Sequence, residues 1–339
     1  MNSLERVVTA LQHKEPDRVP FFNFFTVHGA KILGMDYTDY YSDPENIARA
    51  QIMLREKFGH DCLFPFFYAA VEVEAFGGSR DINLHGPPQA GNPPFNDVNA
   101  LLARELPEPS ETLANPLRAT ELLARECGAE VPILNAIIAP FSLPALLFGM
   151  EHWINTIVTA PDRAREVVEF LLPYSISYSN ALFEKGATAI AYFNPFASPH
   201  IVQFEEYQRL SFDLDKQYFS QIKGPGVFAL AGSRAEPLLA LIAEVGAAGV
   251  VISAQDNLGK IKQDWGDRLN LIGNLNNVAM ESWTPSITDE AVRECCESAA
   301  QGGGYILADH HGDLPERVSD EVLFQIQASV EQWGKYSAA

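Results

Sequence analysis

The sequence predicts an α/β protein that folds as a single (β/α)8 TIM barrel. Short apolar runs alternate with stretches of helical periodicity from one end of the chain to the other. The apolar runs number eight, the number of strands that closes such a barrel. Because these barrels routinely exceed about 250 residues as one unit, the 339 residues need no division, and we expect one domain over residues 1–339.

The expected strands are the apolar runs, and the expected helices lie between them. The strands are 18–25, 61–68, 131–138, 188–194, 226–231, 249–253, 269–273 and 303–308. The helices are 43–58, 115–127, 161–185, 205–222, 236–245, 257–263, 289–300 and 317–333. Gly186, Gly224 and Gly246 stand where helices should stop before the next strand, because glycine readily adopts the left-handed conformation that ends a helix.

Residues 77–109 break the alternation. This segment is rich in glycine, proline and asparagine and is too short for a domain, so it predicts a long loop after the second strand. Two interpretations stay open, a lid over the barrel mouth and an irregular surface excursion.

Charge and composition restrict the partners. A formal net charge of −20 argues against nucleic acid and an anionic membrane surface, since both are recognised by concentrated lysine and arginine. No apolar run approaches the length that spans a bilayer, and the N-terminus lacks a signal-peptide core, so we expect a cytoplasmic protein. The four cysteines have no metal-ligand spacing and predict reduced, structural thiols. The sequence leaves a homodimer open.

The densest group of ionisable residues follows the eighth strand. Asp309, His310 and His311 come directly after its apolar run. Loops at the carboxyl ends of barrel strands carry the chemistry of this fold, so these three residues are the predicted catalytic group. The alternative is a helix start, in which Asp313 caps a helix from about Arg317 and the histidines are ordinary loop residues.

Polar side chains, several of them amides, end the other strands. Buried strands rarely end in asparagine, because each amide carries donors and acceptors that need partners. The residues are Asn23, Tyr68, Asn135, Asn194, Ser233, Gln255, Asp256 and Asn274. Together they predict a pocket for a small, planar, hydrogen-bonding molecule, although any one of them could instead satisfy loop backbone groups.

Five short motifs occur in the order found in one superfamily. Segment 5–20 resembles the opening of the uroporphyrinogen decarboxylase superfamily, and segment 65–77 resembles the matching strand and loop of its cobalamin-dependent methyltransferase branch. Segments 193–199, 272–275 and 305–312 follow the same pattern. The resemblance covers essentially the whole chain and implies a barrel of the uroporphyrinogen decarboxylase type.

Departures from the family patterns indicate the branch. True decarboxylases carry an arginine-rich segment after the first strand and an aspartate at the second strand end, where this chain has 21–28, without arginine, and Tyr68. The thiol-methylating enzymes bind zinc through a His-x-Cys pair after the fifth strand and a Cys after the eighth. Here those regions carry Gly232, Ser233 and His311. Since zinc serves there to stabilise a thiolate, the resemblance implies a methyltransferase without zinc and without a metal site.

Tetrahydrofolate fits such an enzyme, since its N5 amine is already a nucleophile at neutral pH. The resemblance implies methyl transfer between methylcobalamin or a related corrinoid, presented by a corrinoid protein, and tetrahydrofolate. The pterin would be bound by Asn194, Asp256, Asn274 and Asn135, with Tyr68, Glu72 and Glu74 orienting ligand or loop and Arg234 meeting a glutamate-tail carboxylate. The proton on N5 needs a relay, for which we predict His311, with His310 and Asp309 as the other candidates.

Four other functions remain as alternatives. Within the family they are a zinc-dependent methylcobamide:thiol methyltransferase of the coenzyme M type with altered ligands, and a uroporphyrinogen decarboxylase-like lyase. Outside it, Asp256, Asp309 and the histidines could hold a metal for a hydrolase or lyase, although adjacent histidines on an extended chain point to opposite sides. The last is a non-catalytic corrinoid-binding protein, which would leave the amides unexplained.

Overall fold

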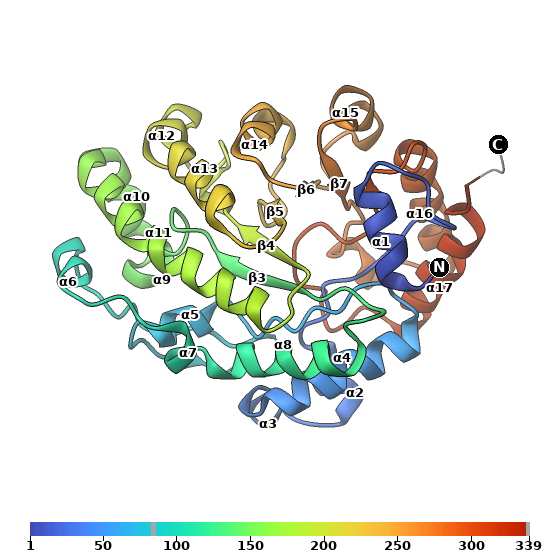
Figure 1. Cartoon of the computed structure of the whole chain (residues 1–339), viewed down its shortest axis with the longest axis horizontal. Helices are drawn as coiled ribbons and strands as arrows, with labels where there is room; N and C mark the ends of the chain where they lie inside the picture. The colour runs from blue at the N-terminus through green and yellow to red at the C-terminus, as the bar shows by residue number, and fades with distance from the viewer. Residues whose placement is uncertain (83–85, 337–339) are drawn as a thin grey trace.

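The computed structural model describes residues 1–82 and 86–336, which form the predicted barrel. Six parallel strands lie in the order β3-β4-β5-β6-β7-β8 and are surrounded by helices (Figure 1). Their bounds are β3 (Leu134–Ile138), β4 (Ala189–Phe193), β5 (Gly226–Ala229), β6 (Gly249–Val251), β7 (Asn270–Ile272) and β8 (Tyr305–Ile306). Nearly every strand residue is buried, as expected for parallel strands covered by helices.

The first two predicted strands are extended segments without regular ladders, and they close the ring. Phe21 pairs with Leu307, and Leu63 pairs with Ile133, in isolated parallel bridges. The amide of Asp61 donates to the carbonyl oxygen of Phe21 at 2.7 Å. Eight segments therefore complete the barrel, and the predicted fold class is confirmed.

The long outer helices follow the predicted ranges closely. They are α4 (Pro44–Phe58), α8 (Ala114–Cys127), α11 (Pro161–Glu184), α15 (Leu258–Trp265), α16 (Pro285–Ala299) and α17 (Asp320–Trp333). Two predicted helices are divided. Helix 205–222 is α12 (Phe204–Leu210) and α13 (Phe212–Gln221), separated at Ser211, and helix 236–245 begins as the 3-10 turn η2 (Glu236–Leu238) and continues as α14 (Leu239–Val245).

Additional helices precede the barrel or lie in its loops. They are α1 (Ser3–Leu11), α2 (His28–Leu33), α3 (Tyr37–Ser42), α5 (Ala70–Ala75), α7 (Pro109–Thr112), α9 (Pro144–Phe148), α10 (Met150–Thr159), η1 (Pro195–Ala197) and η3 (Ala279–Ser282). Most of them span fewer than three turns, which is too short for hydrophobic periodicity to reveal a helix.

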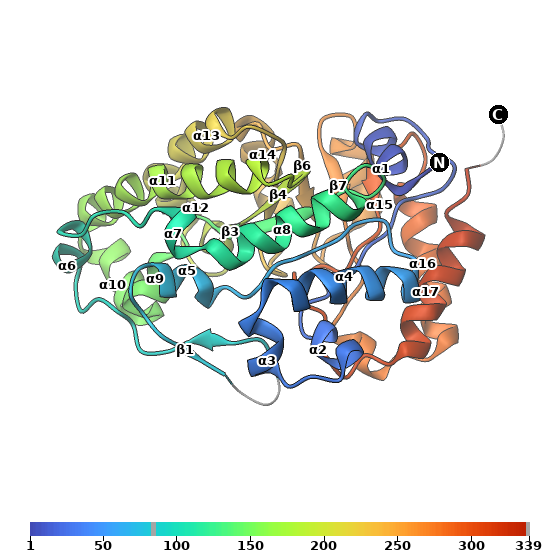
Figure 2. The same ribbon diagram turned by 60° about the horizontal axis from the view of Figure 1, so that its bottom comes forward.

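The predicted loop 77–109 is partly regular, and its positions 83–85 lie outside the described residues. It contains an antiparallel hairpin of β1 (Arg80–Asp81) and β2 (Gln89–Ala90), followed by α6 (Val98–Leu102). Figure 2 shows β1 on the side of the molecule where α2 and α3 lie. Gly86 and Pro87 of the hairpin line a cavity together with His311. The loop therefore reaches the candidate site, and its role as a lid stays a prediction.

Two expectations from composition concern the whole chain. All four cysteines lie in the described part, and none forms a disulfide. In residues 1–82 and 86–336, no helix combines the length and the apolar character that crossing a membrane requires.

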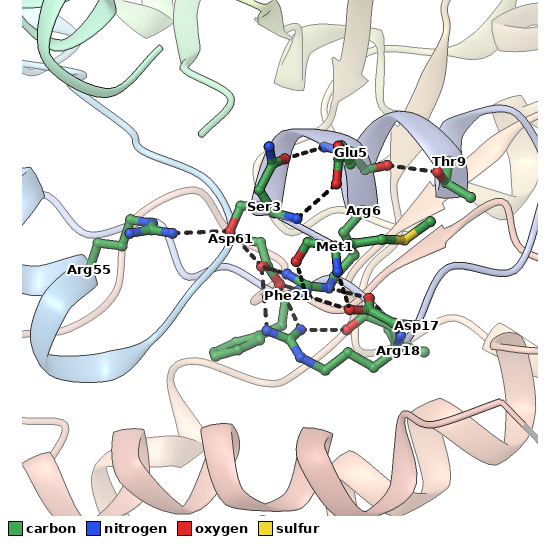
Figure 3. A network of polar contacts seen from close by, with 12 residues as sticks. Met1, Ser3, Glu5, Arg6, Thr9, Asp17, Arg18, Phe21, Arg55 and Asp61 are labelled. Atoms are coloured by element: carbon green, nitrogen blue, oxygen red, sulfur yellow. Dashed lines mark hydrogen bonds and ion pairs between the residues drawn. The ribbon is translucent and has the colours of Figure 1, made fainter. Parts of the chain in front are cut away.

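A buried carboxylate holds the two irregular segments at the amino end of the barrel (Figure 3). Asp61 accepts hydrogen bonds from the Phe21 amide at 3.0 Å and from the Ser3 hydroxyl at 2.8 Å. Its two oxygens also form ion pairs of 2.7 Å with Arg6 and Arg18. One side chain thus links α1, the first segment and the second segment, which have few backbone bonds of their own.

Replacing Asp61 with alanine should therefore destabilise the protein strongly. The change leaves two largely buried guanidinium groups without their shared partner, and removal of one member of a buried ion pair costs about 3–5 kcal/mol. Urea unfolding followed by circular dichroism measures the loss. The control is Asp264→Asn, which removes only an exposed contact to Lys260 and should leave the midpoint unchanged. A loss below about 1 kcal/mol in Asp61→Ala would contradict the role of this carboxylate.

Candidate functional site

An open cavity of about 600 Å³ lies where the loops after the barrel strands meet. Its polar lining consists of His200, Ser233, Gln255, Asn276, His310 and His311. These residues follow β4, β5, β6, β7 and β8, so the cavity is at the carboxyl end of the strands, where this fold places its chemistry.

A second cavity of about 290 Å³ adjoins the first. The two share His311 and Val278 as lining residues. The second is also lined by two carboxylates, Asp313 and Glu316, and by the hairpin residue Pro87. His311 therefore stands between the two spaces, and only the second is lined by carboxylates.

Both predicted histidines face the first cavity. His310 is 7% exposed, His311 is exposed, and their ring centroids lie 6.3 Å apart. The expectation that neighbouring histidines point to opposite sides was wrong, because the chain bends from residue 310 onward and Gly312 has a φ of +100°. Burial lowers the pKa of His310 to about 4, and desolvation also lowers the pKa of His311. Both rings are thus neutral at pH 7 and able to accept a proton.

Asp309 lies behind the histidines, inside the barrel. It is fully buried, and one of its oxygens accepts a hydrogen bond from the Phe24 amide at 2.8 Å. Its other oxygen has no hydrogen-bond partner among the described residues. Burial raises the pKa of Asp309 to about 7. This carboxyl can hold a proton near neutral pH, but it has no direct access to the cavities.

The alternative role for Asp313 as a helix cap was wrong. The helix begins at Asp320, and its cap is Ser319, whose hydroxyl accepts from the Val322 amide. Asp313 instead accepts a hydrogen bond from the hydroxyl of Thr26. The turn after the eighth strand is therefore long enough to place a carboxylate at the site.

Asn194 is buried beneath the cavity, and its amide is already paired. Its oxygen accepts from the Ser142 hydroxyl at 2.8 Å, and its nitrogen donates to Asp215 at 3.1 Å. Asp215 also accepts from the hydroxyls of Tyr192 and Tyr207 at 2.7 and 2.8 Å. Burial raises the pKa of Asp215 to about 6, while these donors act against the rise. In this structure Asn194 joins the end of β4 to α13 and offers no free group to a ligand.

Asp256 and Asn274 fix the loops that form the cavity wall. Asp256 accepts from the Ala235 amide at 2.7 Å and from the side chain of Arg234 at 3.2 Å. Asn274 donates to the carbonyl oxygen of Ser253 at 2.9 Å. These bonds tie together the loops after β5, β6 and β7, so both side chains act on the cavity through the backbone they hold.

Asn135 does not reach the mouth, so its predicted contact with a ligand was wrong. It is the second residue of β3, not its end, and its amide donates to the hydroxyl of Thr120 on α8 at 3.0 Å. An alternating strand places this side chain on the outer face, toward the helices.

The predicted residues of the second loop form a separate polar group. The hydroxyl of Tyr68 donates to Glu74 at 2.8 Å, and Arg80 contacts both residues. Glu72 is buried and accepts from the amide of Ile138, the last residue of β3, at 2.7 Å. Tyr68, Glu74 and Arg80 connect α5 to the hairpin, whereas Glu72 attaches α5 to the barrel.

Of the three residues at the positions where the thiol-methylating pattern has zinc ligands, Gly232, Ser233 and His311, only His311 has a side chain that binds zinc in proteins. Gly232 has a φ of +86°, and a Cβ placed on it would lie 2.8 Å from the ring of His311, so the two loops are in contact. Gly232 and Ser233 offer no thiolate or imidazole. Throughout the described ranges, no three His, Cys, Asp or Glu side chains converge in a way that could hold a metal ion.

Two residues of the site were missed in the sequence. His200 lines the first cavity from the loop after β4, and Glu316 lines the second. His200 follows a strand end by only a few residues, so its place in a strand-helix loop was a usable signal. Glu316 gave no such signal, because it directly precedes the predicted last helix, 317–333.

Known proteins resemble this chain over most of its length. A family model described as uroporphyrinogen decarboxylase (URO-D) matches residues 2–331. The methylcobamide:CoM methyltransferase MtbA of Methanosarcina mazei is 24% identical over 305 residues, with 87% of this chain and 88% of that protein covered. The methylcobamide:CoM methyltransferase MtaA of Methanosarcina barkeri is 23% identical, with 97% of each chain covered. A solved methyltransferase structure from Methanosarcina mazei superposes with a TM-score of 0.84 at 20% identity, covering 98% of this chain and 99% of that one, which shows the fold.

Glu72→Gln should weaken the pH dependence of stability. Burial raises the pKa of Glu72 to about 8, so the folded protein binds this proton more tightly than the unfolded chain does. Stability from this group is therefore complete below the unfolded pKa and is lost as pH rises toward 8. Glutamine keeps an oxygen for the Ile138 amide but cannot ionise.

Urea unfolding at pH 6 and pH 9 gives the measurement. The wild type should lose roughly 2.5–3 kcal/mol more than the variant between these values, because about two pH units of the range lie below the folded pKa. The exposed residue Glu331, changed to glutamine, is the control and should follow the wild type. Equal pH dependence in Glu72→Gln and the wild type would show that Glu72 ionises normally.

Proposed function

This chain belongs to the uroporphyrinogen decarboxylase (URO-D) family, and on that basis we propose that it is a methyltransferase. It would exchange a methyl group between a methylcorrinoid, presented by a corrinoid protein, and a small molecule at the barrel mouth. The observation that supports this proposal most directly is the cavity with two neutral histidines after the eighth strand. The names of the relatives, both methylcobamide methyltransferases that align over most of the chain, supply the reaction class.

The relatives favour a thiol as the methyl acceptor. Both are named for coenzyme M, whose nucleophile is a thiol. The sequence-based argument for tetrahydrofolate relied on free amides at the strand ends. Asn194 is fully paired, Asn135 faces α8, and Asp256 and Asn274 are bound to loop backbone. We therefore propose a thiol as the methyl acceptor. Tetrahydrofolate is the second candidate, because Gly232 and Ser233 supply no sulfur ligand for a zinc ion that would activate a thiol.

The chain's own residues would help by handling a proton. Transfer to a thiol breaks the cobalt–methyl bond, leaves both electrons on Co(I), forms a sulfur–methyl bond and releases the thiol proton. A neutral imidazole within the cavity can accept that proton as the thiol sulfur attacks the methyl group. We propose His311 for this step, since it is exposed to both cavities, whereas His310 is largely buried. The loops held by Asp256 and Asn274 would orient the reactants.

A uroporphyrinogen decarboxylase activity has less support from the site. Such a substrate carries many carboxylates, and arginine is the side chain that pairs best with them. None of the described residues that line the two cavities is an arginine. The lining of the two cavities therefore favours methyl transfer over decarboxylation of a porphyrinogen.

The first expected result is methyl transfer from methylcob(III)alamin to a thiol. Purified protein is incubated with methylcob(III)alamin and, in turn, coenzyme M, homocysteine and tetrahydrofolate, and cob(I)alamin absorbance is followed under anaerobic conditions. We expect turnover with at least one thiol, and persistence of that turnover in chelator because the metal ligands are missing. Turnover only with tetrahydrofolate would favour the second candidate. Loss on chelation with recovery on adding zinc would overturn the metal-free proposal.

The second expected result separates the two histidines. His311→Gln should lower kcat by about 100-fold or more with little change in KM, because glutamine keeps a polar side chain but cannot accept a proton near neutral pH. His310→Gln should have a smaller effect. The pH profile of kcat is the deciding measurement. In the wild type the rate should fall at low pH as the histidine becomes protonated, and this fall should be absent when the proton-accepting histidine is replaced. Unchanged turnover across pH in both variants would exclude a histidine relay.

A further inference from the structure

We infer that the small molecule that exchanges the methyl group carries a positive charge. The inference rests on the proposed function, because it concerns the ligand of the same pair of cavities. It differs from what the relatives' names suggest, since coenzyme M ends in an anionic sulfonate.

The first argument is the charge of the lining. Among the described residues that line the two cavities, none is a lysine or an arginine. The only basic side chains are histidines, and the two that follow the eighth strand have lowered pKa values, so they are neutral at pH 7. An anionic ligand would lose its hydration in the cavity and find no positive side chain there to pair with. That desolvation costs binding free energy even when the site is only partly buried.

The neighbouring arginines are already engaged. Arg234 pairs with Asp256 at 3.2 Å and contacts Glu236. Arg80 pairs with Glu74 at 3.5 Å and contacts the hydroxyl of Tyr68. Neither guanidinium is therefore a free anchor for a sulfonate or a carboxylate.

The second argument is the pair of carboxylates in the smaller cavity. Asp313 and Glu316 line it within one turn of chain, beside His311. The pKa of Asp313 is raised by burial to about 6, so it is mostly ionised at pH 7. No basic lining residue neutralises the two, which gives this cavity a negative field next to the reacting position.

The third argument is an unused acceptor in the larger cavity. His310 lines that cavity and is 7% exposed, yet its Nδ1 has no hydrogen-bond partner among the described residues. A buried polar atom without a partner is uncommon and points to a missing ligand or water. The Nδ1 of a neutral imidazole can accept a hydrogen bond, and a protonated amine offers only donors. A ligand with an ammonium group thus meets both the acceptor and the carboxylates.

A matched series of thiols tests the charge of the acceptor. Cysteamine, 2-mercaptoethanol and coenzyme M share a two-carbon thiol and differ in a positive, neutral or negative end. We expect kcat/KM with methylcob(III)alamin to fall in that order, with cysteamine preferred over coenzyme M by about tenfold or more. The preference should shrink at high salt, because exposed charges are screened. A preference for coenzyme M would overturn the inference.

Cysteamine and coenzyme M also differ in intrinsic reactivity, so a double variant is compared with the wild type by the ratio of their kcat/KM values. In Asp313→Asn/Glu316→Gln, the cysteamine-to-coenzyme M ratio should fall to within about threefold of the ratio without protein. Asparagine keeps an oxygen for Thr26, and circular dichroism checks the fold. The control Glu331→Gln changes charge by one at a distant exposed position and should keep the wild-type ratio. An unchanged ratio in the double variant would also overturn the inference.

Binding without turnover distinguishes the two proposals. Ethylammonium matches cysteamine without its thiol and keeps the N–H donors, and calorimetry can measure its binding whether or not methyl transfer occurs. If no thiol is methylated but this cation binds the wild type and loses at least about tenfold in affinity in the double variant, the proposed thiol reaction fails and the cation site stands. If thiols are methylated without any charge preference and ethylammonium does not bind, the methyltransferase proposal stands and the cation inference fails.

Discussion

Closure of this barrel depends on the buried carboxylate of Asp61, because its first two segments lack the ladders that hold the other six. Asp61 joins the first segment through the Phe21 amide and through Arg18, and it joins α1 through Ser3 and Arg6. The penalty of burying charge is offset only because both guanidinium groups and two further donors meet one carboxylate. The amino end of the barrel is thereby fixed, which leaves the loops at the opposite end free to differ.

The carboxyl end follows a different principle, in which polar side chains are used to hold loops. Asp256 binds the loop after β5, and Asn274 binds the loop after β6. Gly232 lets the β5 loop approach His311, since any side chain there would collide with the ring. The result is a rigid wall around two histidines whose rings are neutral because they are desolvated. Pre-arranged neutral imidazoles suit proton acceptance better than charge binding.

The comparison with relatives sharpens what is particular to this chain. Its fold matches that of a methyltransferase from Methanosarcina mazei, and it aligns over most of its length with methylcobamide:CoM methyltransferases. Its two cavities combine neutral histidines with two carboxylates. Selectivity is a difference in binding energy between competing molecules, so the charges that line a cavity can select a ligand without altering the barrel. The family therefore fixes the scaffold, and the site must be interpreted from its own side chains.

The sequence by itself determined the number and order of the barrel segments, the family, and the place of residues 309–311 directly after the eighth strand. These depend on periodicity and local motifs, which one chain segment carries alone. Only the tertiary structure decided which polar side chains were free. Asn194 and Asn135 look alike in the sequence as strand amides, but one is paired with Asp215 beneath the mouth and the other with Thr120 on the outer face. Asp215 lies 21 residues from Asn194 and Thr120 lies 15 residues from Asn135 along the chain, and hydrogen bonds over such separations are set by packing. For the same reason, the bend that turns both His310 and His311 into one cavity, and the meeting of that cavity with Asp313 and Glu316, could not be predicted from residue order.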